Sequence, residues 1–245
     1  MNQTVSIREF LEETISTNNW LKEHRTKEDR VVWTDYQAAG RGCGSNSWES
    51  ERGKNLLFSV LCHPTGINAS CQFLLLEAMA VAVKEVVDNC IAEGTITVKW
   101  PNDIYWNDCK LGGTLTECGL SGGHLQWCII GTGINVNQTL FTSDAPNPVS
   151  LAQICGCNME REPLLEKIVA LFYQNLKLLE QGGTDLLQKK YMEALYRREG
   201  FHAYRDVHGT FNAEIQTVLP DGMLLLCDDC GQMRRYLFKE VQFIV

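Results

Sequence analysis

Four short segments of the sequence combine residue types that could act on a charged small molecule. The first runs from Gln37 to Trp48 and carries glycines at 40, 42 and 44 around Arg41. Glycine lets a backbone approach a ligand closely and offers N–H groups to anionic oxygens, and an arginine fork suits carboxylate or phosphate. No Gly-Lys-Ser/Thr completes the phosphate loop of P-loop enzymes. On composition alone, a flexible surface loop with an exposed arginine is the alternative.

The second segment is Lys99-Trp100-Pro101-Asn102-Asp103, which is followed by Lys110. Pro-Asn-Asp between two strands is a plausible turn that needs no ligand. A lysine at a strand end inside a pocket can also stabilise charge on a phosphate or an acyl carboxylate. The carboxylate of Asp103 could hold Mg²⁺. The clustering of two lysines, an amide and a carboxylate within twelve residues favours a site.

The third and fourth segments are weaker signals when each is taken alone. Gly131 to Asn137 places glycines at the end of an apolar strand, which indicates either close approach to a ligand or a tight turn. The amide of Asn135 both donates and accepts, so it could read an adenine edge. Ser16-Thr17-Asn18 is typical of a helix N-cap, although its hydroxyls and amide could also bind a neutral polar group.

The histidines and cysteines do not indicate a metal site or a catalytic centre. The five histidines are scattered without metal-ligand spacing, and the sequence holds no Gly-x-Ser-x-Gly elbow. The eleven cysteines are interpreted as reduced thiols. The pairs Cys155/Cys157 and Cys227/Cys230 could suggest zinc, but each pair is isolated, and small buried hydrophobes are the favoured interpretation.

Composition narrows the class of protein. The chain has 245 residues, a net charge of −8 and an isoelectric point near 5.2, which argues against nucleic-acid binding as its main function. No apolar run is long enough for a membrane span, and the N-terminus lacks the pattern of a signal peptide. A cytoplasmic location and no membrane partner are therefore expected.

The elements that must position the four segments follow from hydrophobic periodicity and turn signals. Helices are expected after Ser16, from a Ser70 cap to about Ala92, from near Pro163 to Gly182, and from a Thr184 cap to about Arg198. Strands are expected over residues 5–10, 30–34, 55–61, 95–100, 104–106, 111–117 and 125–132. The last two are joined too tightly for a crossover, so the sheet is antiparallel there. Short strands and turns from about residue 200 predict a small all-β domain, dividing the chain into 1–198 and 199–245.

In this order the four segments resemble biotin–protein ligases. The shared patterns are Ser-Thr-Asn, Gln-x-x-Gly-Arg-Gly-x-x-x-Asn-x-Trp, Lys-Trp-Pro-Asn-Asp with Lys-x-x-Gly-x-Leu-x-Glu, and Gly-x-Gly-Ile-Asn-Val. The resemblance spans most of residues 5 to 195. It implies an α+β fold, with a mixed, largely antiparallel sheet flanked by helices and a small C-terminal SH3-like β domain. Only a few residues precede the first expected strand, so we expect a monofunctional type without an N-terminal DNA-binding domain.

The resemblance also implies an activity. Biotin and ATP would give biotinyl-5'-AMP in the presence of Mg²⁺, and biotin would pass to a specific lysine of a biotin carboxyl carrier protein or domain. No protein nucleophile is needed, because positioning and well-placed cations supply the catalysis. A lipoate–protein ligase and a non-catalytic biotin-binding module are the alternatives. The lipoate enzymes are expected to carry a different glycine loop.

Roles for single residues come from the resemblance alone. Those expected to bind biotin are Ser16, Thr17, Asn18, Gln37, Gly40, Arg41, Gly42, Lys110, Gly131 and Gly133. Those expected to bind the nucleotide are Asn46, Trp48, Asn102, Lys110 and Asn135. Those expected to be catalytic are Lys110, Arg41, Asn102 and Asp103, and Asp103 would also hold Mg²⁺. One departure is Cys43, because the family often has Arg or Gln there, and an arginine would help to retain the acyl-adenylate.

Overall fold

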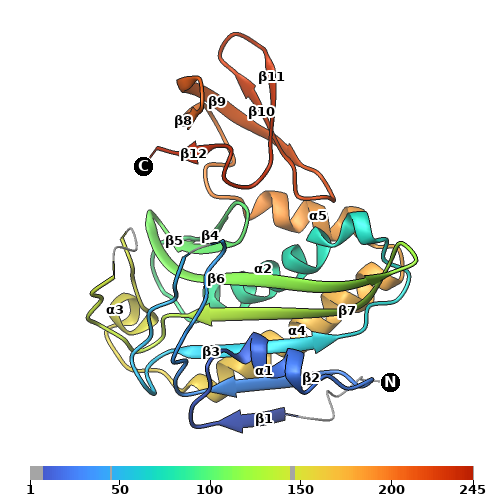
Figure 1. Cartoon of the computed structure of the whole chain (residues 1–245). Coiled ribbons are helices and arrows are strands. Elements are labelled where there is room, and N and C mark those ends of the chain that lie inside the picture. The colour runs from blue at the N-terminus through green and yellow to red at the C-terminus, as the bar shows by residue number, and fades with distance from the viewer. Residues whose placement is uncertain (1–7, 45, 144–146, 245) are drawn as a thin grey trace.

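The larger of two sheets carries most of the chain in this computed structural model, which describes residues 8–44, 46–143 and 147–244. The sheet has seven strands in the order β1-β2-β3-β7-β6-β5-β4 (Figure 1). Their bounds are β1 (Arg8–Leu11), β2 (Arg30–Thr34), β3 (Leu56–Cys62), β4 (Ile96–Lys99), β5 (Asp103–Trp106), β6 (Cys109–Ser121) and β7 (His124–Ile134). Only the β1–β2 pairing is parallel among these described strands. Part of the first expected strand, residues 5–7, lies outside the described residues.

Helices cover the two faces of this sheet unequally. The bounds are α1 (Thr17–Glu23), the 3-10 turn η1 (Ala69–Cys71), α2 (Phe73–Asp88), α3 (Leu151–Cys155), α4 (Arg161–Glu180) and α5 (Thr184–Glu193). Helices α2 and α4 bury the main core against one face, where Phe58 and Ile130 point. Short α1 packs Leu21 against Leu61 and Ile129 on the other face. Because α1 covers only part of that second face, the rest of it stays open for a cleft.

The alternation of side chains along a strand explains this division. Successive residues of a strand point to opposite faces. In β3, Phe58 and Val60 enter the core under α2 and α4, whereas Ser59 and Leu61 point towards α1. The open face therefore receives polar and small residues from the same strands that build the core.

A second sheet is formed by the C-terminal part of the chain. Its five strands are antiparallel in the order β11-β10-β9-β8-β12. Their bounds are β8 (His202–Asp206), β9 (Gly209–Val218), β10 (Leu224–Asp228), β11 (Met233–Tyr236) and β12 (Gln242–Phe243). In Figure 1 this sheet sits beside α5 and the β4–β5 hairpin. The expected α+β class, with a large, mostly antiparallel sheet and a small C-terminal β unit, is confirmed.

Several element ends differ from the expectations. The helix expected from a Ser70 cap to Ala92 is instead η1 followed by α2, which ends at Asp88. Thr184 is the first residue of α5, and its N-cap is Gly183. Helix α3 was not expected, although Ser150 and Gln153 form a capping box at its start, which is a recognisable sequence signal.

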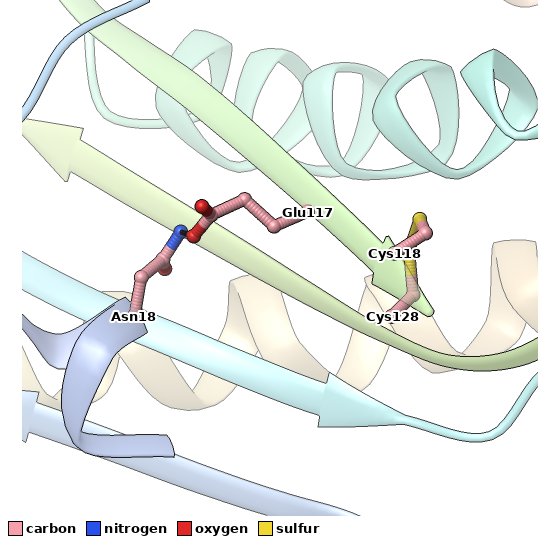
Figure 2. The surroundings of a disulfide bond; sticks show 4 residues. All are labelled: Asn18, Glu117, Cys118 and Cys128. Atoms are coloured by element: carbon pink, nitrogen blue, oxygen red, sulfur yellow. Dashed lines mark hydrogen bonds between the residues drawn. A yellow bond between two sulfur atoms is a disulfide. The ribbon is translucent and has the colours of Figure 1, made fainter. Parts of the chain in front are cut away.

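The expectation that every cysteine is a reduced thiol is wrong for one pair. Cys118 and Cys128 lie directly opposite each other on β6 and β7 and form a disulfide, with a Cα–Cα distance of 4.3 Å (Figure 2). Both pack against the core cluster of α2 and α4. The pairing depends on the register of two strands, which cysteine spacing alone does not reveal.

The two cysteine pairs considered for zinc remain free thiols. Within the described ranges, the one group of three potential metal ligands is Asp228, Asp229 and Cys230. The Asp228 carboxylate is occupied there, because it accepts hydrogen bonds from backbone N–H groups of its own turn and from Arg234. No helix among the described residues is both long and apolar enough to cross a membrane.

Candidate functional site

A cleft of about 680 Å³ opens on the sheet face opposite α2 and α4. It gathers the start of α1, the loop before β3, the β5–β6 hairpin, the end of β7 and the segment 238–243 of the C-terminal sheet. The predicted site residues that line it are Ser16, Thr17, Asn18, Gln37, Arg41, Gly42, Asn46, Trp48, Asn102, Asp103, Lys110, Gly131 and Gly133. Segments far apart in the sequence therefore form one site.

Two predicted residues lie outside this lining. Gly40 is buried behind the loop, where an added Cβ would come within 2.7 Å of the Trp48 carbonyl oxygen. Asn135 lines a smaller adjoining hollow of about 60 Å³, together with Trp48 and Lys110. The Asn135 side chain donates to the carbonyl of Val149 at 3.1 Å, so part of its amide holds the scaffold.

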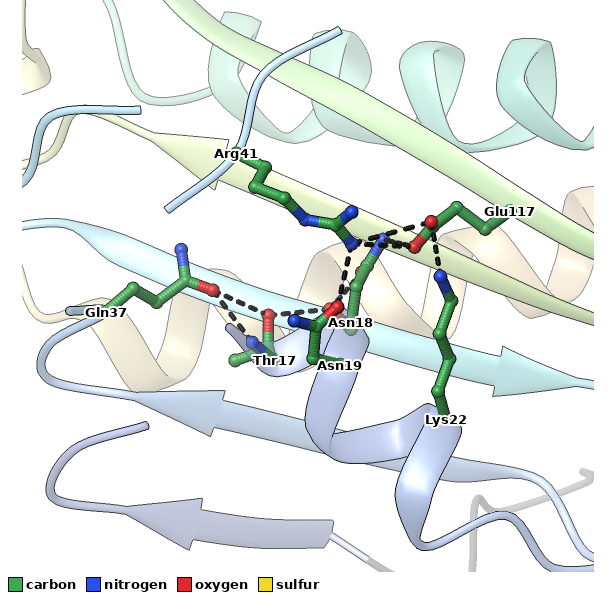
Figure 3. A network of polar contacts seen from close by, with 8 residues as sticks. Thr17, Asn18, Asn19, Lys22, Gln37, Arg41 and Glu117 are labelled. Carbon is green, nitrogen blue, oxygen red and sulfur yellow. Dashed lines mark hydrogen bonds and ion pairs between the residues drawn. The ribbon is translucent and has the colours of Figure 1, made fainter. Parts of the chain in front are cut away.

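One end of the cleft is a buried cluster of neutral polar groups. The Gln37 side-chain oxygen accepts from the backbone N–H of Thr17 at 2.8 Å and from its hydroxyl at 3.1 Å (Figure 3). The Ser59 hydroxyl of β3 lies 2.7 Å from the Thr17 hydroxyl and 2.6 Å from the side-chain amide oxygen of Asn18, within hydrogen-bond distance of both. Because Gln37 uses its oxygen here, its amide nitrogen is left to face the cleft. Sequence reasoning missed Ser59, since nothing local marks one serine in an apolar strand.

Ser16 occupies the N-cap position of α1, and its carbonyl accepts from Trp20 N–H at 2.9 Å. The predicted N-cap position is confirmed, although the Ser16 side chain makes no capping hydrogen bond. The buried hydroxyl instead lines the cleft next to Thr17. A hydroxyl and an amide nitrogen in this setting suit a neutral ligand with both donors and acceptors.

Glu117 of β6 contacts both α1 and the segment Gln37–Trp48, which we call the glycine loop. Its carboxylate accepts from Asn18 at 3.0 Å, pairs with Lys22, and pairs with Arg41 at 3.2 Å (Figure 3). Burial raises the pKa of Glu117, but hydrogen bonds from Lys22 and Asn18 and the charge of Arg41 outweigh it, so the pKa lies below its usual value. Arg41 is further held by the side-chain oxygen of Asn19 at 2.9 Å. Sequence reasoning assigned Glu117 to a motif but gave it no role.

Figure 2 shows the Glu117 side chain directed towards Asn18. The next residue, Cys118, belongs to the opposite face of β6 and packs into the core. The disulfide to Cys128 therefore fixes β6 to β7 directly behind the carboxylate that holds the loop.

The glycine loop is folded as a small hairpin. Arg41 and Ser47 form an antiparallel bridge, and Trp48 N–H donates to the carbonyl of Gly40 at 2.9 Å. This turn brings the Trp48 ring over β7. A Cβ at Gly133 would come within 2.6 Å of the indole, so the close approach requires glycine.

A lysine and a carboxylate form the charged centre of the cleft. Lys110 Nζ lies 2.8 Å from an Asp103 oxygen, across the β5–β6 pair, and both side chains are about three-quarters buried. The Asn102 side chain donates to the carbonyl of Thr114 at 2.6 Å and holds the turn against β6. An anion of a ligand could therefore replace Asp103 as the ion-pair partner of Lys110 without a large movement of the lysine.

Lys99 adds a second cation to the cleft lining. Burial lowers its pKa, as do the charges of Lys110 and Arg197, whereas Asp103 acts in the opposite direction. Its Nζ donates to the Tyr105 hydroxyl at 3.0 Å. Lys99 and Lys110 therefore both interact with the Asp103 carboxylate, and Arg41 lines the same cleft, so this region offers cations for binding an anion such as phosphate.

The fold agrees with solved structures of one class of enzyme. The biotin protein ligase from Aquifex aeolicus in complex with biotin and ATP is similar to this chain, with a TM-score of 0.80 and 25% identity, covering 98% of this chain and 100% of the other. The class defined by the fold is therefore that of the biotin protein ligases.

The sequence comparisons name the family. Residues 8–135 match the Biotin/lipoate A/B protein ligase family. The "Bifunctional ligase/repressor BirA" of Bacillus subtilis (strain 168) is 32% identical over 246 residues, which covers 96% of this chain and 73% of that relative. The "Biotin--[acetyl-CoA-carboxylase] ligase" of Paracoccus denitrificans is 28% identical over 56% of this chain and 58% of that relative. The chain belongs to the biotin/lipoate A/B protein ligase family.

Proposed function

We propose that this chain is a biotin–protein ligase that activates biotin with ATP and transfers it to a lysine of a carrier protein. The observation that carries the proposal is one cleft with two chemically different ends. A neutral cluster around Thr17 and Gln37 lies at one end, with Arg41 beside it, and Lys110 lies towards the other end with Asp103. Biotin has the same two ends, a neutral ureido ring and a carboxylate. The similarity to biotin protein ligases supports the same assignment.

The first step forms an acyl-adenylate. A biotin carboxylate oxygen attacks the α-phosphorus of ATP, and the bond to the departing pyrophosphate breaks, which gives biotinyl-5'-AMP. Negative charge accumulates on the phosphate oxygens in this step. Lys110 would stabilise that charge, and the Arg41 loop would hold the reactants and keep water from the mixed anhydride.

The second step transfers the acyl group. The ε-amine of a carrier lysine attacks the acyl carbon of biotinyl-5'-AMP, AMP leaves with the bonding electrons, and the amine loses a proton to give an amide. Positioning is the main contribution of the chain, because the mixed anhydride is already activated.

The roles of the biotin-binding residues follow the geometry of the neutral cluster. The Ser16 hydroxyl and the Gln37 amide nitrogen would hydrogen-bond the ureido group, with Thr17 and Asn18 fixed behind them by Ser59. The backbone of β7 would lie along the ligand. The glycines at 131 and 133 leave room there for the side chains of Asn18 and Trp48, and those at 40 and 42 let the loop pack on itself.

The nucleotide would occupy the cleft beside this cluster. Trp48 and Asn135 line the small hollow that would take adenine, and Asn46 and Asn102 line the main cleft. Mg²⁺ takes oxygen ligands, commonly one or two carboxylates together with substrate phosphates. Asp103 fits as a single carboxylate ligand, and a bound ion would neutralise phosphate charge there.

The wider setting is proposed on the same basis. A biotin carboxyl carrier domain is the proposed partner, in keeping with the carboxylase in the name of the Paracoccus relative. We propose a cytoplasmic location, no nucleic-acid or membrane partner, and two domains at 1–198 and 199–245. A lipoate–protein ligase is not favoured, because the relatives compared above are biotin ligases.

Biotin-dependent exchange of pyrophosphate into ATP tests the proposed chemistry without a carrier. A ligase reverses adenylate formation, so exchange should require biotin and should be absent with lipoate in its place. Biotin binding without exchange would support a non-catalytic binding module instead.

A further inference from the structure

Lys239 has an unusual backbone for a lysine. It lies in the turn between β11 and β12, and its φ is 71°, in the left-handed region. That region is unfavourable for residues with a Cβ, and glycine or asparagine normally occupies it. A lysine at this position needs a reason in its side chain, since the backbone alone would favour glycine.

The turn is held firmly against the site. Phe238 packs edge-on against Trp100, with ring centroids 6.4 Å apart. Trp100 is buried and donates its indole N–H to the carbonyl of Gly222 at 2.9 Å. Trp100 belongs to the segment Lys99–Asp103, so the residue before Lys239 is anchored on the same segment that supplies Asp103 to the cleft.

The Lys239 side chain reaches the glycine loop across the cleft. It lines the cleft, and a Cβ at Gly44 would collide with its Nζ and Cε atoms. Burial raises the pKa of the Cys43 thiol, and the charge of Lys239 opposes this more strongly than that of Lys110. Among the described residues, Lys239 has neither an ion pair nor a side-chain hydrogen bond. Its ammonium group therefore lies at the cleft with no counter-ion among the residues that the structure describes.

We propose that Lys239 is a nucleotide-binding residue, which places a cation from the C-terminal sheet on the phosphates of ATP beside the glycine loop. This inference rests on the proposed function, because the anion that it assigns is the nucleotide of that reaction. It gives the C-terminal sheet a direct part in the site. It also places a cation next to Cys43.

The experiment compares Lys239→Gln, Lys239→Arg and Lys239→Gly with the wild type and with Lys189→Gln as a control. The Lys189 side chain is 71% exposed on α5 and is not part of the cleft lining, and it pairs with Glu193 of the same helix at 3.9 Å. The KM values for ATP and for biotin are measured separately by biotin-dependent pyrophosphate exchange, and the melting temperature is measured for each variant.

Lys239→Gln should raise the KM for ATP about five- to tenfold, a modest effect because the contact is partly solvated. The KM for biotin should change less than about twofold, and Lys239→Arg should restore most of the ATP affinity. Lys239→Gly should show the same ATP defect without a lower melting temperature, because glycine suits the backbone. An unchanged KM for ATP in Lys239→Gln would overturn the inference, as would equal changes for ATP and biotin with a lower melting temperature.

Direct binding separates this inference from the proposed function. Calorimetric titration of the full chain with MgATP measures affinity without turnover. If the wild type binds ATP but gives no biotin-dependent exchange, the proposed function fails, and weaker ATP binding by Lys239→Gln still supports Lys239. If the wild type shows exchange and Lys239→Gln binds ATP normally, only the inference about Lys239 fails.

Discussion

At the scale of single residues, the site depends on ion pairs that a substrate can replace. Lys110 pairs with Asp103 at 2.8 Å, and Arg41 pairs with Glu117 at 3.2 Å. Each cation also lines the cleft, so each is held in place before an anionic ligand arrives. Preorganised charge of this kind lowers a barrier because little rearrangement is needed during the reaction.

Lys110→Ala and Arg41→Ala should each lose most of the pyrophosphate exchange activity. Removing one well-placed group that stabilises transition-state charge typically costs about 100-fold or more in rate. Both side chains are partly exposed, so the fold and melting temperature should change little. Arg8→Ala, which removes an exposed ion pair to Glu166, is the matched control. Turnover near the wild-type rate in either cleft variant would count against the assignment.

Glu117 acts through the loop and is a positioning residue. Glu117→Gln removes the charge that holds Arg41 and Lys22, so the loop should dock less often. We expect kcat/KM for biotin to fall about three- to tenfold, with a melting temperature near that of the wild type. A melting temperature that falls while kcat/KM stays constant would show a purely structural role.

The pH dependence of the same carboxylate has a definite sign. The folded-state pKa of Glu117 lies below its usual value, so its stabilising charge is complete above the ordinary carboxyl range. It is lost only as the pH falls through the lowered pKa. The contribution of Glu117 to loop docking should therefore persist at neutral and mildly acidic pH, and a wild-type activity that differs from Glu117→Gln only above pH 7 would contradict this.

At the scale of elements, α2 carries a carboxyl group in the core. Glu77 is fully buried on α2, and neither of its oxygens has a hydrogen-bond partner among the described residues. Burial raises its pKa to about 8. The folded protein therefore holds a proton that the unfolded chain releases above about pH 4.5. The contribution of Glu77 to the free energy of unfolding therefore falls as the pH rises from about 4.5 to 8, and it changes no further above pH 8.

Glu77→Gln should remove this pH-dependent cost. At pH 9 the free energy of unfolding of the variant should exceed that of the wild type by up to about 5 kcal/mol, and the difference should shrink towards zero near pH 4.5. Urea unfolding at a series of pH values measures it, with exposed Glu28→Gln as the control. A difference that does not vary with pH would contradict the prediction.

Local signals predicted most of these elements, because apolar periodicity and turn residues act over a few positions. The strands from β2 to β7 and helices α1, α2, α4 and α5 fall where the sequence indicates. Their ends were less predictable, as with α2, which stops at Asp88. The antiparallel pairing of β6 with β7 was predicted from their tight connection, but the register was not, and so neither was the disulfide between Cys118 and Cys128.

The candidate site shows the same limit. Its segments were recognisable because each carries unusual local composition, such as the glycines around Arg41. Residues that join the site only through the fold were missed. Ser59 arrives from the middle of β3, and Lys239 arrives from the C-terminal sheet. A single serine or lysine in those positions has no local signature.

At the scale of the whole molecule, the cleft is a property of both sheets. The large sheet offers its uncovered face, and the C-terminal sheet supplies Phe238 to Phe243 along the rim. Trp100 links the two through the carbonyl of Gly222. Substrates of two kinds, a small acid with ATP and then a carrier lysine, would have to be handled at this one opening.

The most direct test is mass spectrometry of a biotin carrier domain incubated with the protein and MgATP, with biotin or with lipoate in parallel. The account predicts a biotin-sized mass increase on one carrier lysine and no increase with lipoate. A mass increase with lipoate alone would contradict the proposed substrate, and no increase with either acid would contradict the proposed ligase activity.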